Sequence, residues 1–350
     1  MTYNIPPETA AALAAQPRVR LAHLPTPIQP WPRLSDALGG PKLWVKRDDL
    51  TGLATGGNKT RKLEFLVADA LQAGADSLIT AGGPQSNHCR QTAAAAAQLG
   101  LDAHLVLGGD PPPPDHVQGN LFLDQLLGAT THFVDKTQRN AKMQSLADEL
   151  RAAGRSPYVI PVGGSNAVGT LGYVAAMFEL AEQLNAMPNV RFDRIVMATS
   201  SGGTQAGLTM GAKMIGFASF RGRAPVTAIS IDQEPEDADT FTFRDHVRDT
   251  ANECAEMLGS DVKISENDLP INHDYLGGGY GVVGPPEIEA VNLLATLEGQ
   301  FVGPVYTSRA LAGLIDLIRN GQIDRKETIL VWHTGGDAAL HAYRHSLTSM

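Results

Sequence analysis

Short apolar runs alternate along the chain with longer segments in which apolar residues recur at helical spacing. The runs are rich in Val, Ile and Leu, which is typical of strands buried on both faces of a parallel sheet. The expected strands are Leu43–Arg47, Ser77–Thr80, Ala103–Leu107, His132–Val134, Tyr158–Val162, Ile195–Ala198, Thr227–Ile231 and Thr328–Trp332. The expected helical segments include Arg61–Ala73, Asn87–Leu99, Ala141–Ala153, Gly169–Leu184 and Gln205–Ile215. The alternation predicts βαβ units and a doubly wound α/β architecture.

Two glycine-rich breaks indicate where the chain passes between domains. One is Gly163–Asn166, between a strand and a long helix, and the other is Gly56–Asn58. We therefore expect residues 60–164 to form a small α/β domain. It is inserted into a larger domain made of residues 1–59 and 165–350.

Composition narrows the class of protein. The chain has 350 residues, 43% of them hydrophobic, with 28 Lys and Arg against 37 Asp and Glu, a net charge of −9. This composition argues against disorder, and the acidic balance argues against binding to nucleic acid. There is no apolar run of about 18 residues, so no membrane span is expected.

The sequence near the N-terminus and the cysteine count bear on the location of the protein. Arg18 and Arg20 follow the short alanine run instead of preceding it, so we expect no secretory signal. We therefore expect a cytoplasmic protein. Two cysteines, Cys89 and Cys254, are too few for a disulfide framework or a four-thiolate zinc site. We expect no metal.

The first glycine cluster, Thr55–Lys62, places Lys59, Arg61 and Lys62 at the start of a helix. A cation is disfavoured there because a helix N-terminus is already positive. One interpretation is that the side chains extend into solvent. The other is that a lysine with a lowered pKa acts as an amine nucleophile. The spacing does not match a Walker-type phosphate loop.

The second cluster, Ala81–His88, follows a strand and opens a helix, whose free N–H groups suit a carboxylate or phosphate. The simpler alternatives are that Ser86 or Asn87 only caps the helix and that His88 is structural. Cys89 is most simply a small core residue.

The third cluster, Ser200–Gly207, presents successive backbone N–H groups flanked by hydroxyls, a pattern that favours a phosphate cradle. A dinucleotide site, with Asp232 on the ribose, is the competing interpretation. The Gly-Gly-x-x-x-Gly spacing argues against it. Two tyrosines, Tyr280 and Tyr306, also stand in glycine-rich or helix-opening contexts, although each alone is more often a packing residue.

Taken together, three motifs carry a resemblance to a known family. They are Asn58–Glu64, Gln85–His88 and Pro304–Thr307, and the likeness runs from Leu24 to Gly336. The chain resembles the D-cysteine desulfhydrase and 1-aminocyclopropane-1-carboxylate deaminase family. This resemblance implies pyridoxal 5'-phosphate as cofactor. It also implies two doubly wound α/β domains of the tryptophan synthase β-like fold, fold type II, and a homodimer.

The resemblance also implies roles for individual residues. Lys59 is expected to bind the cofactor covalently and Asn87 to contact its ring hydroxyl oxygen. Thr334, or less favourably Thr307, is expected to face the ring nitrogen. The expected phosphate loop is Ser201, Gly202, Gly203 and Thr204. The substrate carboxylate is expected at Ser86, Asn87 and His88, and the remaining substrate side is expected to be lined by Tyr280, Tyr306 and Thr307. Of these, Lys59, Ser86, Tyr280 and Tyr306 are the expected catalytic residues.

Two positions favour one reaction within the family. Ring-opening deaminases look to carry Glu at the position of Thr307 and tend to have Gln at that of His88. The chain is therefore expected to catalyse α,β-elimination, most simply of D-cysteine to pyruvate, hydrogen sulfide and ammonia, with 1-aminocyclopropane-1-carboxylate deamination less favoured.

L-Cysteate, which would release sulfite, is the alternative substrate. Arg309 would recognise its sulfonate unless that side chain is simply solvated. From a different class, a non-catalytic two-lobed ligand-binding protein is the competing hypothesis.

Overall fold

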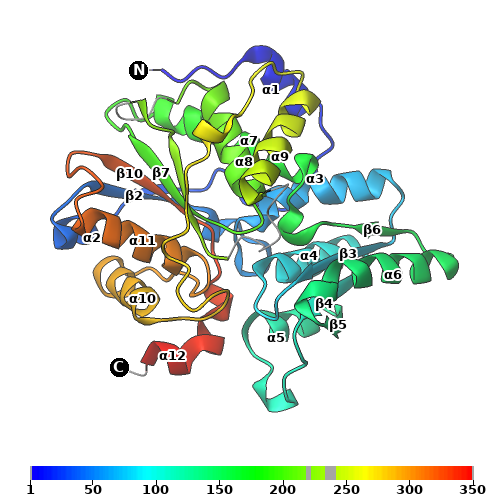
Figure 1. Cartoon of the computed structure of the whole chain (residues 1–350). Helices are drawn as coiled ribbons and strands as arrows, with labels where there is room; N and C mark the ends of the chain where they lie inside the picture. Colours follow the sequence, from blue (N-terminus) through cyan, green and yellow to red (C-terminus); the bar gives the residue numbers. More distant parts are fainter. Residues whose placement is uncertain (1, 218–221, 233–241, 349–350) are drawn as a thin grey trace.

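The computed structural model describes residues 2–217, 222–232 and 242–348, and within them it places two sheets side by side, each flanked by helices (Figure 1). The strands are β1 (Ile28–Pro30), β2 (Lys42–Arg47), β3 (Ser77–Gly82), β4 (Asp102–Gly108), β5 (Thr130–Val134), β6 (Pro157–Val159), β7 (Arg194–Thr199), β8 (Val226–Ser230), β9 (Ile271–Asn272) and β10 (Thr328–His333). The α-helices are α1 (Pro7–Ala14), α2 (Pro32–Leu38), α3 (Lys59–Gln72), α4 (Asn87–Leu99), α5 (Gly119–Leu126), α6 (Arg139–Ala152), α7 (Ala167–Asn185), α8 (Gly203–Met214), α9 (Phe243–Met257), α10 (Pro285–Glu298), α11 (Thr307–Arg319) and α12 (Arg344–Thr348).

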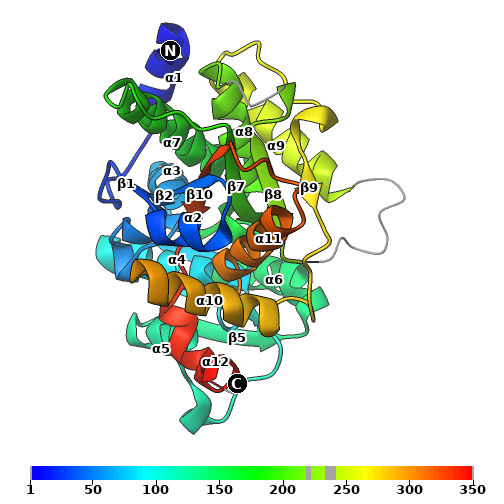
Figure 2. The same ribbon diagram turned by 90° about the vertical axis from the view of Figure 1, so that its left-hand side faces the viewer.

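The larger sheet has the strand order β1-β2-β10-β7-β8-β9. Its strands are parallel except β1, which is antiparallel to β2. Alternate residues of β7 point to opposite faces. Ile195 and Met197 pack with α7, α8 and α9, while Val196 and Ala198 pack with α2, α10 and α11. Figure 2 shows these helix layers on either side of the sheet.

The smaller sheet has the order β5-β4-β3-β6 and is entirely parallel. One face packs against α3, α4 and Leu121 of α5, and the other packs against α6. The structure thus confirms the expected α/β class with parallel sheets. Within the described residues, none of the helices combines the length and apolar composition that a bilayer crossing requires.

Every expected strand overlaps an observed one, with a clear difference at Tyr158–Val162. There β6 ends at Val159, and Val162–Gly164 forms a short 3-10 turn. Pro161 has no N–H with which to continue a ladder, which accounts for the early end. The short strands β1 and β9 were not expected from the apolar pattern. The boundaries of the small domain at residues 60 and 164 stay a prediction.

The carboxylate of Asp48, just after β2, is fully buried and joins four separate segments of the chain. It accepts hydrogen bonds from Thr26 (2.9 Å), Arg61 (2.8 and 2.9 Å), Tyr173 (2.7 Å) and Trp332 (2.8 Å). The expectation that Arg61 extends into solvent is therefore wrong. Its guanidinium is 1% exposed and also pairs with Glu179 at 3.0 Å.

We predict that Asp48→Ala destabilises the fold by about 3–5 kcal/mol, because it leaves the guanidinium of Arg61 buried without its closest partner. Urea unfolding followed by circular dichroism measures this change. Asp36→Ala, at an exposed position on α2, is the matched control and should change the free energy of unfolding by no more than about 0.5 kcal/mol. Equal midpoints for the two variants would contradict the prediction.

Candidate functional site

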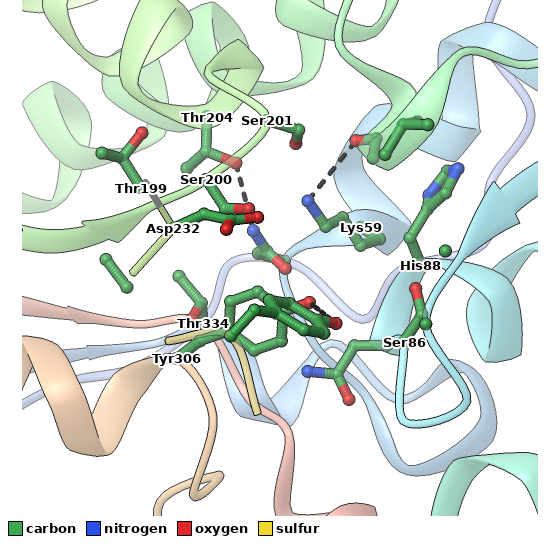
Figure 3. Close-up of a pocket in the computed structure, with 18 of the residues that line it drawn as sticks. Lys59, Ser86, His88, Thr199, Ser200, Ser201, Thr204, Asp232, Tyr306 and Thr334 are labelled. Carbon is green, nitrogen blue, oxygen red and sulfur yellow. Dashed lines mark hydrogen bonds between the residues drawn. The ribbon is translucent and has the colours of Figure 1, made fainter. Parts of the chain in front are cut away.

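A pocket that is partly open to solvent lies where the carboxyl ends of strands from both sheets meet (Figure 3). It is lined by residues that follow β3, β7, β8 and β10, by the start of α3 and α4, and by Lys136 and Arg139. Ligands bind at this edge of parallel α/β sheets, so the pocket is the candidate small-molecule site. Figure 3 shows Ser200, Ser201 and Thr204 above Lys59, with Tyr306 and Thr334 below it.

Lys59 is the first residue of α3 and its side chain lies in the pocket. Its amine Nζ lies 3.4 Å from the carbonyl oxygen of Gly163. Burial lowers the pKa of Lys59 to about 8. The residue before it is held on both sides, because the Asn58 N–H donates to the Thr334 carbonyl (3.0 Å) and the Asn58 amide donates to the Thr204 hydroxyl (3.1 Å). The backbone at the start of α3 is therefore held in place. A larger share of the Lys59 amine is uncharged than of a solvated lysine.

A second lysine, Lys62, lies one helical turn further on and is fully buried, contrary to the solvent-exposed interpretation. Its Nζ donates to the Gly163 carbonyl (3.0 Å) and the Ser165 hydroxyl (3.1 Å). Burial first, and then the charge of Lys59, hold the pKa of Lys62 well below its usual value. Sequence reasoning did not single out Lys62 as a site residue. The signal was present, since three cations open one helix.

Gly163 allows both lysines to share one carbonyl. Its φ is +69°, and a Cβ there would lie 2.0 Å from the Ser201 hydroxyl oxygen. Both features exclude a side chain at this position.

The expected phosphate loop surrounds the start of α8. Ser201, Gly202 and Thr204 line the pocket, whereas Gly203 does not. The N–H of Gly203 donates instead to the Ser165 hydroxyl (3.1 Å), which itself donates to the Ser201 hydroxyl (2.9 Å). Ser165 therefore holds the loop through Gly203 and Ser201, and Lys62 donates in turn to Ser165.

The second cluster forms the turn into α4. The Ser86 hydroxyl accepts from the Cys89 N–H (3.2 Å), so Ser86 is the helix cap. His88 is neutral, because burial, helped by the charges of Lys59 and Lys62, holds its pKa well below the usual value. The Thr80 hydroxyl donates to the Ile160 carbonyl, so His88 Nε2 must donate to Thr80 (2.9 Å) and Nδ1 is an acceptor. The His88 side chain therefore offers no donor to a carboxylate.

Cys89 is fully buried among the core residues of the smaller sheet, as expected. Burial raises the pKa of its thiol to about 12. Its interpretation as a core residue is confirmed.

The tyrosines and threonines lie on the opposite side of the pocket. Tyr280 and Tyr306 both line it, and their hydroxyls lie 2.7 Å apart. Burial raises the pKa of both, so both are neutral. Thr334 lines the pocket, while Thr307 lies behind it with the two hydroxyl oxygens 2.9 Å apart.

Arg309 is neither solvated nor part of the pocket lining, so both expectations for it are corrected. Its guanidinium donates to Glu287 (2.7 Å) and to the carbonyls of Ile231, Gly279 and Val282 (3.1, 3.0 and 2.7 Å). The last two carbonyls flank Tyr280. Arg309 therefore holds the Tyr280 loop against the end of β8.

Comparison with known proteins places this geometry in a family. Residues 19–335 match the family described as "Pyridoxal-phosphate dependent enzyme". The chain belongs to this family. A D-cysteine desulfhydrase of Salmonella newport is 42% identical over 338 residues, which cover 93% of this chain and 96% of the relative.

Two further relatives point to the same group. A protein of Pyrococcus horikoshii, whose name suggests a 1-aminocyclopropane-1-carboxylate deaminase, is 40% identical over 347 residues, or 98% of this chain and 99% of its own. The crystal structure of a protein titled as an ACC deaminase homologue has a TM-score of 0.86 and 40% identity, covering 99% of both chains. The chain is thus a pyridoxal-phosphate-dependent lyase of this group, with the fold type II architecture.

The pocket fits the family's cofactor. Pyridoxal phosphate needs an uncharged amine for its aldehyde and donors for its phosphate. Lys59 supplies the first. The loop at the start of α8 supplies backbone N–H groups and hydroxyls, and the Lys62 amine lies behind the pocket lining, where it donates to Ser165. A phosphate dianion would also compensate for the two buried lysines.

We predict that Lys59→Ala abolishes the visible absorption band of the cofactor-loaded protein, because the neighbouring amine of Lys62 does not line the pocket and is held by Gly163 and Ser165. Absorbance of the purified protein after addition of the cofactor measures this. Lys42→Ala, at an exposed position on β2, is the control and should keep the band. A visible band retained in the Lys59 variant would show that another lysine carries the cofactor.

Proposed function

We propose that the chain is a D-cysteine desulfhydrase. It converts D-cysteine and water to pyruvate, hydrogen sulfide and ammonia by α,β-elimination. When bound, the cofactor withdraws electrons from the α-carbon of the attached amino acid and so acidifies its proton. Lys59, whose pKa is lowered to about 8, is the proposed base for that proton.

Other pocket residues hold the two charged ends of the complex. Ser201, Gly202 and Thr204, with Gly203 and Lys62 behind them, are the proposed phosphate site. The backbone N–H groups at the start of α4 and the Ser86 hydroxyl are proposed to hold the substrate carboxylate, with His88 contributing its backbone alone. Asn87 is proposed to donate to the ring oxygen of the cofactor.

Tyr280 and Tyr306 are proposed to orient the substrate and to protonate its leaving group. Their raised pKa values keep both phenols protonated at neutral pH. The 2.7 Å contact between their hydroxyls means that one donates to the other and leaves a single phenol proton for the substrate side.

The observation that carries the proposed reaction is the hydroxyl pair Thr334–Thr307. Thr334 is proposed to face the ring nitrogen, with Thr307 behind it. A neutral hydroxyl leaves that nitrogen largely unprotonated, which limits electron withdrawal by the ring. Elimination of a good leaving group needs less electron withdrawal than opening a carbon ring, so this arrangement favours elimination.

The position of Arg309 supports sulfide over sulfite as the leaving group, because its guanidinium is committed to Glu287 and three carbonyls. L-Cysteate remains the alternative substrate. Lys136 and Arg139 line the pocket on the side of the smaller sheet and are the cations there that could meet a sulfonate.

We also propose that the protein is a cytoplasmic homodimer. Leu126 and Phe122 on α5 are 70% and 50% exposed, and a second copy of the chain would cover them. Two free, buried cysteines are in keeping with a reducing compartment. Sedimentation at the mass of two chains would support the dimer.

We predict that D-cysteine gives equal amounts of pyruvate and sulfide with the loaded enzyme. The panel also contains L-cysteine, L-cysteate, D-serine and 1-aminocyclopropane-1-carboxylate, with pyruvate, sulfide, sulfite and 2-oxobutanoate measured. Sulfite from L-cysteate at a higher kcat/KM would replace the proposed substrate with the alternative. Release of 2-oxobutanoate from the cyclopropane compound as the main activity would overturn the argument from Thr307 and Thr334.

We predict that Thr307→Glu alone does not create cyclopropane ring opening. Thr307 lies behind Thr334 and not in the pocket lining. A carboxylate there would change the surroundings of the cofactor's ring nitrogen but would not reach the substrate as a base. Production of 2-oxobutanoate measures this, with Ser308→Ala as the neighbouring control. Ring opening at a rate comparable to the elimination would contradict the prediction.

A further inference from the structure

Asn87, the first residue of α4, contacts the pocket through a side chain whose two ends are chemically different. An amide oxygen turned to the pocket would accept hydrogen bonds, whereas an amide nitrogen would donate them. The Asn87 oxygen is already occupied, since Oδ1 accepts from Asn120 Nδ2 at 2.9 Å. The nitrogen is therefore the end left for a ligand.

Asn120, the second residue of α5, is fully buried and uses both ends of its own amide. Its Nδ2 donates to Asn87 and to the Gln85 carbonyl (2.8 Å). Its Oδ1 accepts from the Arg90 guanidinium (3.1 Å). Its backbone N–H donates to the Gln85 side chain (2.9 Å), which holds the start of α5 against the turn before α4.

Arg90 determines the direction of this chain of hydrogen bonds. A guanidinium can only donate, so Asn120 must turn its oxygen toward Arg90 and its nitrogen toward Asn87. Asn87 must then turn its oxygen toward Asn120. The hydrogen bonds from Arg90 to Asn120 and from Asn120 to Asn87 can therefore run in one direction only. Arg90 is itself buried, and its second nitrogen donates to the Gly56 carbonyl (2.7 Å), three residues before Lys59.

We propose that Arg90 and Asn120 are positioning residues that keep Asn87 a hydrogen-bond donor toward the ring oxygen of the cofactor. Neither residue lines the pocket, so both act through Asn87. The same guanidinium holds the loop that leads into Lys59, so one buried cation supports two parts of the pocket, Asn87 and the start of α3. This inference rests on the proposed role of Asn87, but not on the identity of the substrate.

The test is Asn120→Asp, which keeps the size of the side chain and its contact with Arg90 but removes the donor to Asn87 and to the Gln85 carbonyl. The Asn87 amide is then expected to turn, donate to the new carboxylate and present its oxygen to the pocket. A donor stabilises the anionic form of a ring oxygen and an acceptor destabilises it. Absorption should therefore move from the visible to the near-ultraviolet at neutral pH, as the ring oxygen holds its proton. Cofactor binding should weaken roughly 10- to 100-fold.

Two comparisons separate positioning from general damage. Asn252→Asp on α9 alters another amide that both donates to and accepts from the backbone, at Ile264, and should leave the spectrum unchanged. In an Asn87→Ala background, Asn120→Asp should have no further effect on the spectrum, because it acts through Asn87. A wild-type spectrum and affinity in folded Asn120→Asp would overturn the proposal, as would an equal change without the Asn87 side chain.

Arg90→Lys provides a second variant should Asn120→Asp fail to fold. A lysine cannot donate in the fixed fork that reaches both Asn120 and Gly56. It should shift the spectrum in the same direction by a smaller amount, and an unchanged spectrum in the folded variant would overturn the proposal. All of these readouts need cofactor and no substrate, so failure of the D-cysteine assignment is scored separately by the substrate panel.

Discussion

The buried carboxylate of Asp48 is the contact on which the geometry of the pocket depends. It is the meeting point of the segment before β1, the first turn of α3, the middle of α7 and strand β10. Because Arg61 is two residues beyond Lys59, anchoring its guanidinium also fixes where α3 begins. Strand β10 ends one residue before Thr334. The relative positions of Lys59 and Thr334 across the pocket are therefore set by one buried carboxylate.

At three places around the pocket, a buried arginine orients polar groups that a ligand would meet. Arg61 orients the start of α3, Arg90 orients Asn120, and Arg309 orients the loop that bears Tyr280. Each guanidinium is a donor that cannot reverse, so it imposes a single arrangement on flexible amides and carbonyls. The net charge of the chain, −9, has no part in this, because these effects act over a few ångströms.

The sequence predicted every strand except the short β1 and β9, five of the longer helices and the junctions that line the pocket, because hydrophobic period and glycine position are local signals. Three cations at a helix start drew attention to Lys59, Arg61 and Lys62 together, and only the family resemblance singled out Lys59. It did not locate the partners of Arg61 and Arg309, which come from residues such as Glu179 and Glu287, distant in sequence. The sequence also did not show which of two hydroxyls lines the pocket and which lies behind it. Thr334 lines the pocket and Thr307 lies behind it, and this depends on the direction in which each side chain points.

The thiol of Cys89 lies close to the pocket but is buried in the core of the smaller sheet. It lies in the first turn of the helix that opens the pocket, and a Cβ on Gly82, which does line the pocket, would lie 2.8 Å from its Sγ. Thiolates, not thiols, attack disulfides and electrophiles, and the pKa of this thiol, raised to about 12 by burial, leaves it protonated in the cell. Packing alone therefore keeps this sulfur out of thiol–disulfide exchange, although only the backbone of Gly82 separates it from the pocket.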